Sequence, residues 1–329
     1  MLRWNFERYS FWDLPCHACN SRNGWHTSFY SRRSNSYIAV ANCRQCGAEQ
    51  FLKKYRQFGN ANKSVAQWEY EALQRLNGGS RSEPAFLLPR AYSFAATTHA
   101  LSMEYLNGES MDERMRRALD RQGFDDCLRV SATWLKGLHG TLAICDKTGN
   151  DCTTLLRRLE SGCRFLAARN VMVAQALMYM RCRLDEINSS PVKRVLLHAD
   201  FKASNLMWTR NGVYGIDGGL RFKNPGVMDA AQFIANLLLD RRNIQTIANE
   251  SDVTLILDVF LEAYGDNSRS TRNLTAWWLL YFLLSRWEED LKGWKSSMFV
   301  DRNYAAALAD SMAYCETIGL WASPANQGS

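Results

Sequence analysis

One segment near the middle of the chain carries residue types that suit phosphoryl transfer. In VLLHADFKASNLMWTRNGVYGID (195–217), Asp200 follows an apolar strand, Asn205 comes five residues later, and Asp217 ends a second apolar strand. A hairpin of this kind delivers two carboxylates and an amide to neighbouring strand ends. Transfer of a γ-phosphoryl group needs a carboxylate to accept or orient the acceptor hydroxyl, and oxygen ligands to hold Mg²⁺ on the phosphates. The segment therefore predicts Asp200 as the base and Asn205 and Asp217 as Mg²⁺ ligands.

Two CxxC pairs near the N-terminus form a second chemical motif. CHAC (16–19) and CRQC (43–46) are separated by a stretch typical of β-strands. CxxC spacing lets two thiolates reach one ion, and two such turns complete a tetrahedral zinc site. Asn20 and Gly47, which follow the two pairs, suit tight turns. We predict a closed, structural Zn²⁺ site on Cys16, Cys19, Cys43 and Cys46, with His17 as the rival fourth ligand.

The elements that must position these residues divide the chain into a sheet-rich part and a helical part. Residue patterns predict strands at 26–31, 37–42, 49–56, 86–92 and 99–105, and a helix at 64–76. Asn107-Gly108 interrupts the pattern, and beyond it we predict helices at 110–122, 126–139, 153–182 and within 227–318, with a short strand at 194–197. We therefore expect an N-terminal lobe of residues 1–106 and a helical C-terminal lobe of residues 107–329.

Length and composition agree with two lobes and exclude several classes of protein. The 329 residues are 47% apolar and 22% charged, which is typical of a folded chain with a large core and not of a disordered protein. The formal net charge is +7, and residues 1–110 hold 13 basic and 8 acidic side chains. Because this excess is modest and also fits a solvated face, it does not predict nucleic-acid binding.

The sequence predicts neither a signal peptide nor a membrane span. Its first residues, MLRWNFERYSFWD, mix charges with aromatic groups, and its most apolar run, 276–284, is shorter than the ~20 residues that a bilayer requires. We therefore expect a cytoplasmic protein with reduced thiols. The cysteines outside the two CxxC pairs are then predicted to be small core residues: Cys127, Cys145, Cys152, Cys163, Cys182 and Cys315.

The segment 195–217 resembles the Brenner motif of the aminoglycoside phosphotransferase and choline kinase families. HADFKASN stands in place of their HGDxxxxN pattern, and GIDGG in place of their IDxx metal-binding segment. The resemblance covers roughly residues 25–240. It implies an α+β, bilobal protein-kinase-like fold with a small antiparallel-sheet N-lobe and a larger helical C-lobe, and it implies ATP as the phosphoryl donor. The CxxC pairs are foreign to the common family pattern and look like an added zinc knuckle.

Further residues occur in the order that the resemblance implies. Lys53 resembles the strand lysine that holds the α- and β-phosphates, and Glu69 resembles the helix glutamate that pairs with it. Strand alternation turns Lys53 and Lys54 to opposite faces, so only one of them can point toward the phosphates. Lys54 remains the alternative to Lys53, and Glu71 the alternative to Glu69. SMEYL (102–106) resembles the hinge strand that receives adenine. The resulting set of nucleotide-binding residues is Lys53, Glu69, Met103, Glu104, Tyr105, Met207 and Ile216.

Other matching segments are expected to support the site. WLKGLH (134–139) is similar to the family's helix that ends in Leu-His, and Asp229 resembles the aspartate of a later Asp-Leu-Ala segment. We expect Trp134 to pack in the core, and Asp229 and His198 to order the catalytic loop.

Some features depart from the family pattern. The turn expected to cover the nucleotide, SRRSNS (31–36), holds no glycine, although protein kinases use glycines there. Arg32 or Arg33 would contact phosphate in this turn, unless the turn is merely solvated. Lys202 is like the lysine with which protein Ser/Thr kinases stabilise the transferring phosphoryl group, whereas small-molecule kinases more often have histidine. No Ala-Pro-Glu segment follows Asp217, which weighs against a protein kinase with an activation loop.

Together these features predict an ATP- and Mg²⁺-dependent phosphotransferase acting on a hydroxyl of a small molecule or glycan, with Asp200 and Lys202 as catalytic residues. One alternative is a protein kinase or a nucleotidyltransferase of the same fold. Another is a non-enzymatic, zinc-containing kinase-like scaffold that binds a partner. Acidic side chains on predicted helices would either bind a cationic acceptor or only form helix faces exposed to solvent. These residues are Asp112, Glu113, Glu288, Glu289 and Asp290.

Overall fold

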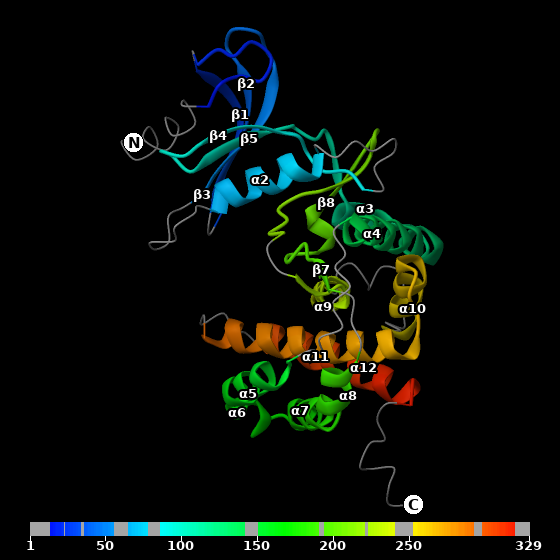
Figure 1. Cartoon of the computed structure of the whole chain (residues 1–329). Coiled ribbons are helices and arrows are strands. Elements are labelled where there is room, and N and C mark those ends of the chain that lie inside the picture. Colours follow the sequence, from blue (N-terminus) through cyan, green and yellow to red (C-terminus); the bar gives the residue numbers. More distant parts are fainter. Residues whose placement is uncertain are drawn as a thin grey trace, which may run out of the picture. The chain divides into compact units, whose positions relative to one another are not determined.

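An antiparallel sheet of five strands forms the N-terminal part of the protein in the computed structural model (Figure 1). The structure describes residues 14–22, 24–33, 36–55, 65–77, 86–141, 151–190, 194–220, 223–240, 253–292 and 298–319. The sheet has the order β1–β2–β3–β5–β4, with strands β1 (Trp25–Arg32), β2 (Ser36–Cys43), β3 (Glu49–Tyr55), β4 (Ala91–Ala95) and β5 (Ala100–Met103). The first three strands and β5 confirm the sequence prediction.

Helix α2 (Val65–Asn77) packs on strands β3, β4 and β5. Its buried residues repeat at helical spacing, and they are Ala66, Glu69, Ala72, Leu73 and Leu76. A carboxylate on the buried face of an amphipathic helix is unusual, because charged groups avoid burial unless they are paired. The residue at 56, the last of the predicted third strand, lies outside the described residues.

The strand predicted at 86–92 is wrong in its position, because β4 begins only at Ala91. Pro89 has no N–H to donate to a ladder, so the chain before Ala91 does not join the five-stranded sheet. Leu87 instead forms a parallel bridge with Tyr214, and its carbonyl accepts a hydrogen bond of 3.0 Å from the N–H of Gly215.

The chain divides into two compact units, of residues 1–109 with 207–220, and of 110–206 with 221–329. We predicted the boundary at 106/107 and assigned all later residues to the helical lobe, whereas the hairpin 207–220 groups with the first unit. A small sheet of order β6–β8–β9 includes this hairpin: β6 (Gly108–Ser110), β8 (Leu206–Thr209) and β9 (Gly212–Gly215). Any Cβ at residue 108 would collide with the Trp208 carbonyl, so the close approach requires glycine there.

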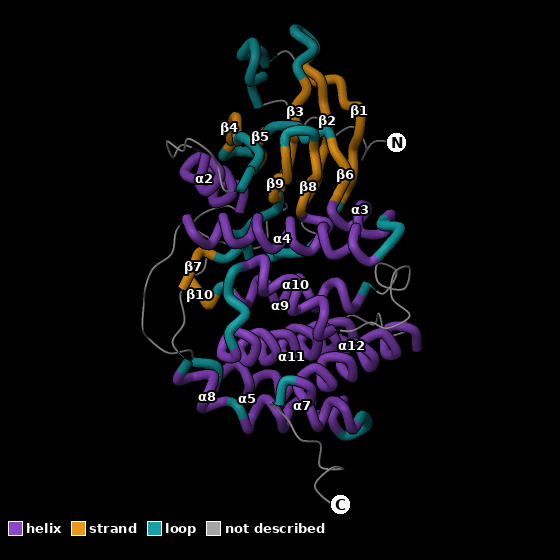
Figure 2. The backbone as a smooth tube through the Cα atoms, turned by 90° about the vertical axis from the view of Figure 1, so that its right-hand side faces the viewer, coloured by secondary structure: helices purple, strands orange, loops and turns teal. Residues whose placement is uncertain are grey.

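The second unit is mainly helical (Figure 2). Its helices are α3 (Met111–Arg117), α4 (Arg121–Thr141), α5 (Thr153–Gly162), α6 (Arg164–Ala167), α7 (Val171–Cys182), α8 (Leu184–Ser189), α9 (Val227–Leu239), α10 (Val253–Tyr264), α11 (Arg269–Lys292) and α12 (Met298–Thr317). Helix α11 lies between α9 on one side and α5, α7 and α8 on the other (Figures 1 and 2). The short strand β7 (Arg194–Leu196) pairs with β10 (Lys223–Pro225), a strand that the sequence pattern missed.

Two long predicted helices are interrupted by residues that cap a new helix. The helix predicted at 110–122 ends at Arg117, because the Asp120 side chain accepts a 2.8 Å hydrogen bond from the N–H of Gly123 at the start of α4. The helix predicted at 153–182 is broken before α7, where Asn170 accepts hydrogen bonds from the N–H groups of Met172 and Val173. Side-chain caps thus outweigh the continuous apolar periodicity.

The apolar run at 276–284 lies in α11, where most of its side chains are buried. Among the helices that the structure describes, none combines the length and apolar character needed to cross a bilayer. Of the six remaining cysteines, four are buried as predicted, at 127, 152, 163 and 315, whereas Cys182 is exposed and that prediction is wrong. Residue 145 lies outside the described residues.

Candidate active site

A buried lysine forms the centre of a charged cluster in the first unit. Lys53, on β3, is 4% exposed, and its Nζ donates to Glu69 Oε1 at 3.0 Å and Oε2 at 3.1 Å. The same Nζ donates to Oδ1 of Asp217 at 2.6 Å. Burial acts to lower the pKa of Lys53, but the two carboxylates outweigh it and hold the pKa well above its usual value. The side chain therefore stays a cation.

Local structure explains why these side chains meet. Lys53 lies in the middle of the sheet, opposite Ile38 on β2 and Leu101 on β5. Helix α2 packs on β3, β4 and β5, with Glu69 on its buried face. Of the two alternatives left open by the sequence, the structure pairs Lys53 with Glu69. Lys54 lies on the opposite face of the strand, and Glu71 accepts a hydrogen bond of 3.0 Å from Gln67 of its own helix.

Tyr55 is a further member of the cluster that sequence reasoning missed. Its hydroxyl donates to Glu69 Oε2 at 2.6 Å, and its ring centroid lies 4.6 Å from Lys53 Nζ. Burial, followed by the charge of Glu69, raises the pKa of the Tyr55 phenol, which keeps the donor proton in place. Side chains alternate along a strand, so Tyr55 falls on the same face as Lys53, and this is the signal that could have identified it.

Asp217 has an unusual backbone conformation. Its φ is 59°, in the left-handed region that non-glycine residues adopt rarely, although aspartate tolerates it better than most. The turn after β9 thereby directs the carboxylate to Lys53, while the side chain remains 49% exposed. Asp217 is therefore fixed by an ion pair and still accessible to a ligand.

The residues predicted to bind adenine lie at β5, its following segment and the β8–β9 hairpin. Met103 ends β5 and is buried, whereas Tyr105, Met207 and Ile216 are half-buried. The N–H of Glu104 donates to the Arg90 carbonyl at 2.8 Å, so this amide is already engaged within the protein.

The second unit carries the loop that follows β7. The carboxylate of Asp200 accepts hydrogen bonds at Oδ2 from Lys202 Nζ at 2.7 Å and from Asn205 Nδ2 at 2.9 Å. Asn205 is buried in the 3-10 turn η2 (Ala203–Asn205), and its Nδ2 also donates to the Asp200 carbonyl at 2.8 Å. Both of these side-chain hydrogen bonds use the same carboxylate oxygen, Oδ2. The predicted Asp200, Lys202 and Asn205 therefore form one constellation.

Asp229 organises this loop from α9. The Asp229 carboxylate is 1% exposed and accepts the backbone N–H groups of His198 at 2.6 Å and Ala199 at 3.0 Å. His139 Nε2 donates to it at 3.1 Å, and His139 Nδ1 accepts from the Tyr264 hydroxyl at 2.8 Å. Sequence reasoning named Asp229 and the Leu-His helix but missed Tyr264, for which the sequence carried no signal.

The residue before Asp200 is held in a strained conformation. Ala199 has a φ of 66°, a region that favours glycine, and the resembled families have glycine at this position. The backbone N–H groups of His198 and Ala199 both donate to Asp229, and these two hydrogen bonds hold the loop in place. The His198 ring is buried against Trp134 and Phe201, at centroid distances of 5.9 and 5.6 Å, and Trp134 also stacks on Phe201.

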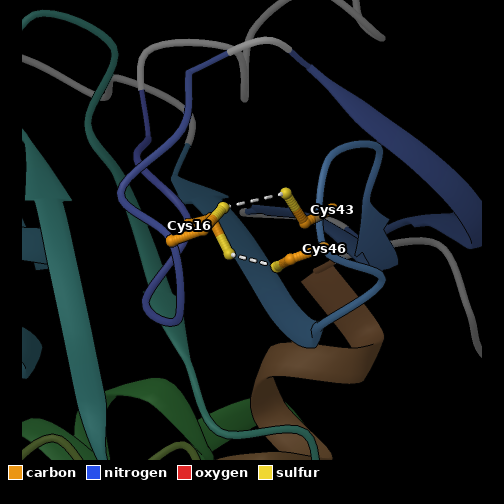
Figure 3. Close-up of side chains that lie close together, drawn as sticks. Cys16, Cys43 and Cys46 are labelled. Atoms are coloured by element: carbon orange, nitrogen blue, oxygen red, sulfur yellow. Dashed lines mark hydrogen bonds between the residues drawn. The ribbon is translucent and has the colours of Figure 1, made fainter.

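The four predicted zinc ligands lie together in the first unit (Figure 3). The Sγ atoms of Cys16, Cys19, Cys43 and Cys46 all lie within 4.8 Å of one another. His17, the rival ligand, instead contacts Gln50 Oε1 with its Nδ1 at 2.9 Å and stacks on Tyr92. The donor set is therefore four sulfurs, which fits Zn²⁺ and does not fit Mg²⁺.

Comparisons with known proteins reveal similarity in structure only. No protein-family model matches the sequence, and a search of curated protein sequences finds no match. An ethanolamine kinase from Plasmodium vivax matches with a TM-score of 0.57 and 14% identity over 95% of this chain and 89% of that chain. A choline/ethanolamine kinase family protein from Mesorhizobium loti matches with a TM-score of 0.56 and 15% identity over 99% and 97%.

An ADP-bound aminoglycoside phosphotransferase also matches, with a TM-score of 0.54 and 14% identity over 89% of this chain and 94% of that chain. Identities this low establish the fold and nothing finer. The small antiparallel sheet, the helical remainder and these three structures confirm the predicted fold class: the chain has the α+β protein-kinase-like fold shared by choline/ethanolamine kinases and aminoglycoside phosphotransferases.

Proposed function

We propose that this protein is an ATP- and Mg²⁺-dependent phosphotransferase that moves the γ-phosphoryl group to a hydroxyl of a small molecule. The observation that carries the proposal is the buried ion pair of Lys53 with Glu69 and Asp217. Burial of a cation costs free energy unless the cation is paired. Lys53 is kept charged by its partners and lies beside the accessible carboxylate of Asp217, an arrangement that suits phosphate binding. Solved structures with this fold include a choline kinase and an amicoumacin kinase bound to AMP-PNP, which supports the same class of reaction.

On the nucleotide side, Lys53 would donate to the α- and β-phosphate oxygens while Glu69 holds its ammonium group in place. Asn205 and Asp217 would supply oxygen ligands to Mg²⁺, Asn205 through Oδ1 because its Nδ2 is bonded to Asp200. Bound Mg²⁺ neutralises negative charge on the phosphate oxygens. The four-cysteine site would bind Zn²⁺ and takes no part in this step.

The adenine ring would lie against Met103, Tyr105, Met207 and Ile216. Because the N–H of Glu104 is bonded to Arg90, we assign Glu104 to nucleotide binding through its backbone carbonyl. That carbonyl would accept a hydrogen bond from the adenine amino group, which is a donor.

On the acceptor side, Asp200 would act as the base. Its Oδ2 is held by Lys202 and Asn205, so Oδ1 would accept the proton of the acceptor hydroxyl. As the hydroxyl oxygen bonds to the γ-phosphorus, the bond from that phosphorus to the bridging oxygen breaks and ADP leaves. Lys202 would stabilise the negative charge of the transferring phosphoryl group.

The acidic side chains considered for a cationic acceptor are mostly engaged in their own helices. Asp112 pairs with Arg116, Glu288 pairs with Lys292, and Asp290 accepts a hydrogen bond of 2.6 Å from Tyr304. Glu113 forms a capping box with Ser110 at the start of α3. These contacts favour helix solvation and capping over substrate binding. We therefore name a small-molecule hydroxyl as the acceptor and assign no residue to a cationic group.

The test is Asp200→Ala in an assay of phosphoryl transfer against amino alcohols, aminoglycosides, sugars, glycans and peptides. We expect ATP turnover stimulated by an acceptor in the parent, and a loss of about 10²- to 10⁴-fold in the variant. Because Asp200 is partly exposed, the melting temperature should stay near that of the parent. Full activity in a folded Asp200→Ala variant would overturn the assignment.

Labelled nucleotides separate phosphoryl transfer from nucleotidyl transfer. Label from the γ-phosphate should reach the acceptor, and label from the α-phosphate should not. Transfer from the α-phosphate alone would replace the proposed reaction with a nucleotidyl transfer, and label on peptides alone would indicate a protein kinase. Absence of nucleotide binding by calorimetry would contradict both reactions.

A further inference from the structure

We propose that the four cysteines bind a single Zn²⁺ ion that clamps residues 16–20 to the β2–β3 turn and so stabilises the strand that carries Lys53. The site belongs wholly to the first unit and lies outside the residues assigned to phosphoryl transfer. Its metal chemistry does not depend on the proposed function.

The two CxxC turns have the same backbone geometry, which is the first observation. In each turn the residue after the second cysteine has a positive φ, 58° at Asn20 and 76° at Gly47. In the first turn, the N–H of Asn20 donates to the Cys16 carbonyl at 2.9 Å, and the N–H of Cys16 donates to the Ser21 carbonyl at 3.0 Å. In the second turn, the N–H of Gly47 donates to the Cys43 carbonyl at 2.8 Å, and the N–H of Cys43 donates to the Ala48 carbonyl at 2.9 Å. Two unrelated loops have no reason to match in this way, whereas two halves of one tetrahedral site do.

The spacing of the sulfurs fits one ion and not a disulfide. Across the two turns, Cys16 Sγ lies 3.6 Å from Cys46 Sγ (Figure 3). Cys19 Sγ lies 3.7 Å from Cys43 Sγ. A disulfide requires ~2.05 Å. A tetrahedron with Zn–S bonds of ~2.3 Å has S–S edges of ~3.8 Å, which agrees with both distances. Four thiolates complete the tetrahedron, so no position is left for water and the metal would be structural.

The clamp acts where the hydrophobic core is small. The core beside the site consists of Leu14, Cys16, Trp25, Ala39, Ala41, Cys43, Leu52 and Ala100, among which alanine and cysteine predominate. Small side chains bury little apolar area, so a metal would supply stability that this core lacks.

The clamped segment continues directly into contacts with the sheet. The N–H and Nδ1 of His17 both donate to Gln50 Oε1 on β3, at 2.8 and 2.9 Å, and the His17 ring stacks on Tyr92 of β4 at 4.1 Å. Gln50 lies three residues before Lys53 on the same strand. Metal binding at residues 16–19 therefore secures the start of β3.

Metal content and coordination test the site directly on the full chain. We expect about one Zn²⁺ per chain in the purified protein and, after replacement by Co²⁺, the absorption bands of a tetrahedral thiolate site. Thiol-specific reagents should release the zinc in step with modification of the four site thiols, counted apart from the exposed Cys182. A parent protein that holds no zinc, or gives the weak bands of an octahedral cobalt site, would overturn the proposal.

A matched pair of variants separates zinc binding from general loss of a thiol. Cys46 and Cys182 are both exposed, so serine at either position removes little packing. Cys46→Ser should lose most of the bound zinc and lower the melting temperature, whereas Cys182→Ser should leave both unchanged. If Cys46→Ser retains zinc and the parental melting temperature, the four-thiolate site is wrong. If it fails to fold, the cobalt spectrum of the parent decides.

Hydrogen exchange tests the clamping role. Removal of zinc by a chelator should speed the exchange of amides in β1, β2 and β3, while amides in α11 should keep their rates. Equal exchange in these strands with and without zinc would show that the ion is bound but stabilises nothing. Neither readout requires phosphotransferase activity, so failure of the proposed reaction would leave this result interpretable.

Discussion

The hydroxyl of Tyr55 donates a hydrogen bond of 2.6 Å to the carboxylate of Glu69, the same carboxylate that receives both hydrogen bonds from Lys53. The two residues come from β3 and α2, so the contact locks the helix to the strand at the point where the lysine is buried. Tyr55 would therefore be a positioning residue, because it acts on Lys53 through Glu69.

Tyr55→Phe removes this hydrogen bond and keeps the ring. We expect the free energy of unfolding to fall by about 1.5 kcal/mol, because hydrogen bonds to charged groups contribute ~1.5–3 kcal/mol. The KM for ATP should rise several-fold, with a smaller change in kcat. Denaturant titration and steady-state kinetics measure these effects. Tyr70→Phe, on the neighbouring position of α2, is the control, and equal behaviour of the two variants would contradict a positioning role.

Lys53→Met and Lys54→Met distinguish the two lysines of β3. Loss of Lys53 removes a charge-assisted contact with phosphate, so calorimetry should show ATP affinity falling by at least about 10-fold, equivalent to ~1.4 kcal/mol. It also leaves the Glu69 carboxylate buried without its cation, which should destabilise the first unit by ~3–5 kcal/mol. Lys54→Met should bind ATP as the parent does. The reverse order would reassign the phosphate-binding lysine.

The raised pKa of Lys53 predicts how stability depends on pH. The pKa of Lys53 is higher in the folded state than in the unfolded state, where it is ~10.4. Such a lysine contributes its full stabilisation at pH values below the unfolded pKa, and this contribution is lost as the pH rises toward the folded pKa. The difference in unfolding free energy between the parent and Lys53→Met should stay constant from about pH 7 to 9 and shrink above ~10.4. Urea titrations across this range measure it, and a difference that shrinks already near neutral pH would contradict the raised pKa.

Ala199→Gly relieves the strain before Asp200. An L-residue in the left-handed region costs ~1–2 kcal/mol, and part of this gain is offset because glycine makes the unfolded chain more flexible. We expect the variant to be more stable by about 0.5–1 kcal/mol, with the loop hydrogen bonds to Asp229 retained. Thermal and chemical unfolding check the sign. Destabilisation by this substitution would show that the strain is not present.

Asp229→Asn tests the carboxylate beneath the loop. Asparagine has only one acceptor oxygen, so one of the buried N–H groups at 198 and 199 would lose its partner, at a cost of ~1–3 kcal/mol. We expect lower stability and a fall in kcat larger than any change in the KM for ATP. Asp126→Asn, at an exposed position on α4, should change neither quantity. An Asp229→Asn variant with parental kcat would show that this carboxylate does not position the loop.

The sequence alone determined much of the candidate site. The spacing of Asp200, Asn205 and Asp217 and the two CxxC pairs were visible because each depends on neighbours within a few residues. The same local character made β1, β2 and β3 predictable, since alternation along a strand and tight turns are properties of short segments. The caps at Asp120 and Asn170 were also local, but their polar side chains compete with helical periodicity, and the pattern alone did not show which would prevail.

Only the tertiary structure decided which charges meet. Lys53 and Lys54 are equal in sequence, and the choice between them follows from the face of β3 on which α2 packs. The ion pair of Lys53 with Asp217 joins residues 164 positions apart, and the contact of His139 with Tyr264 joins residues 125 apart. Contacts of this range arise when the core packs, and burial then makes every unpaired charge costly. Residue spacing thus determined the chemistry available to this protein, and packing decided which side chains are held in position to perform it.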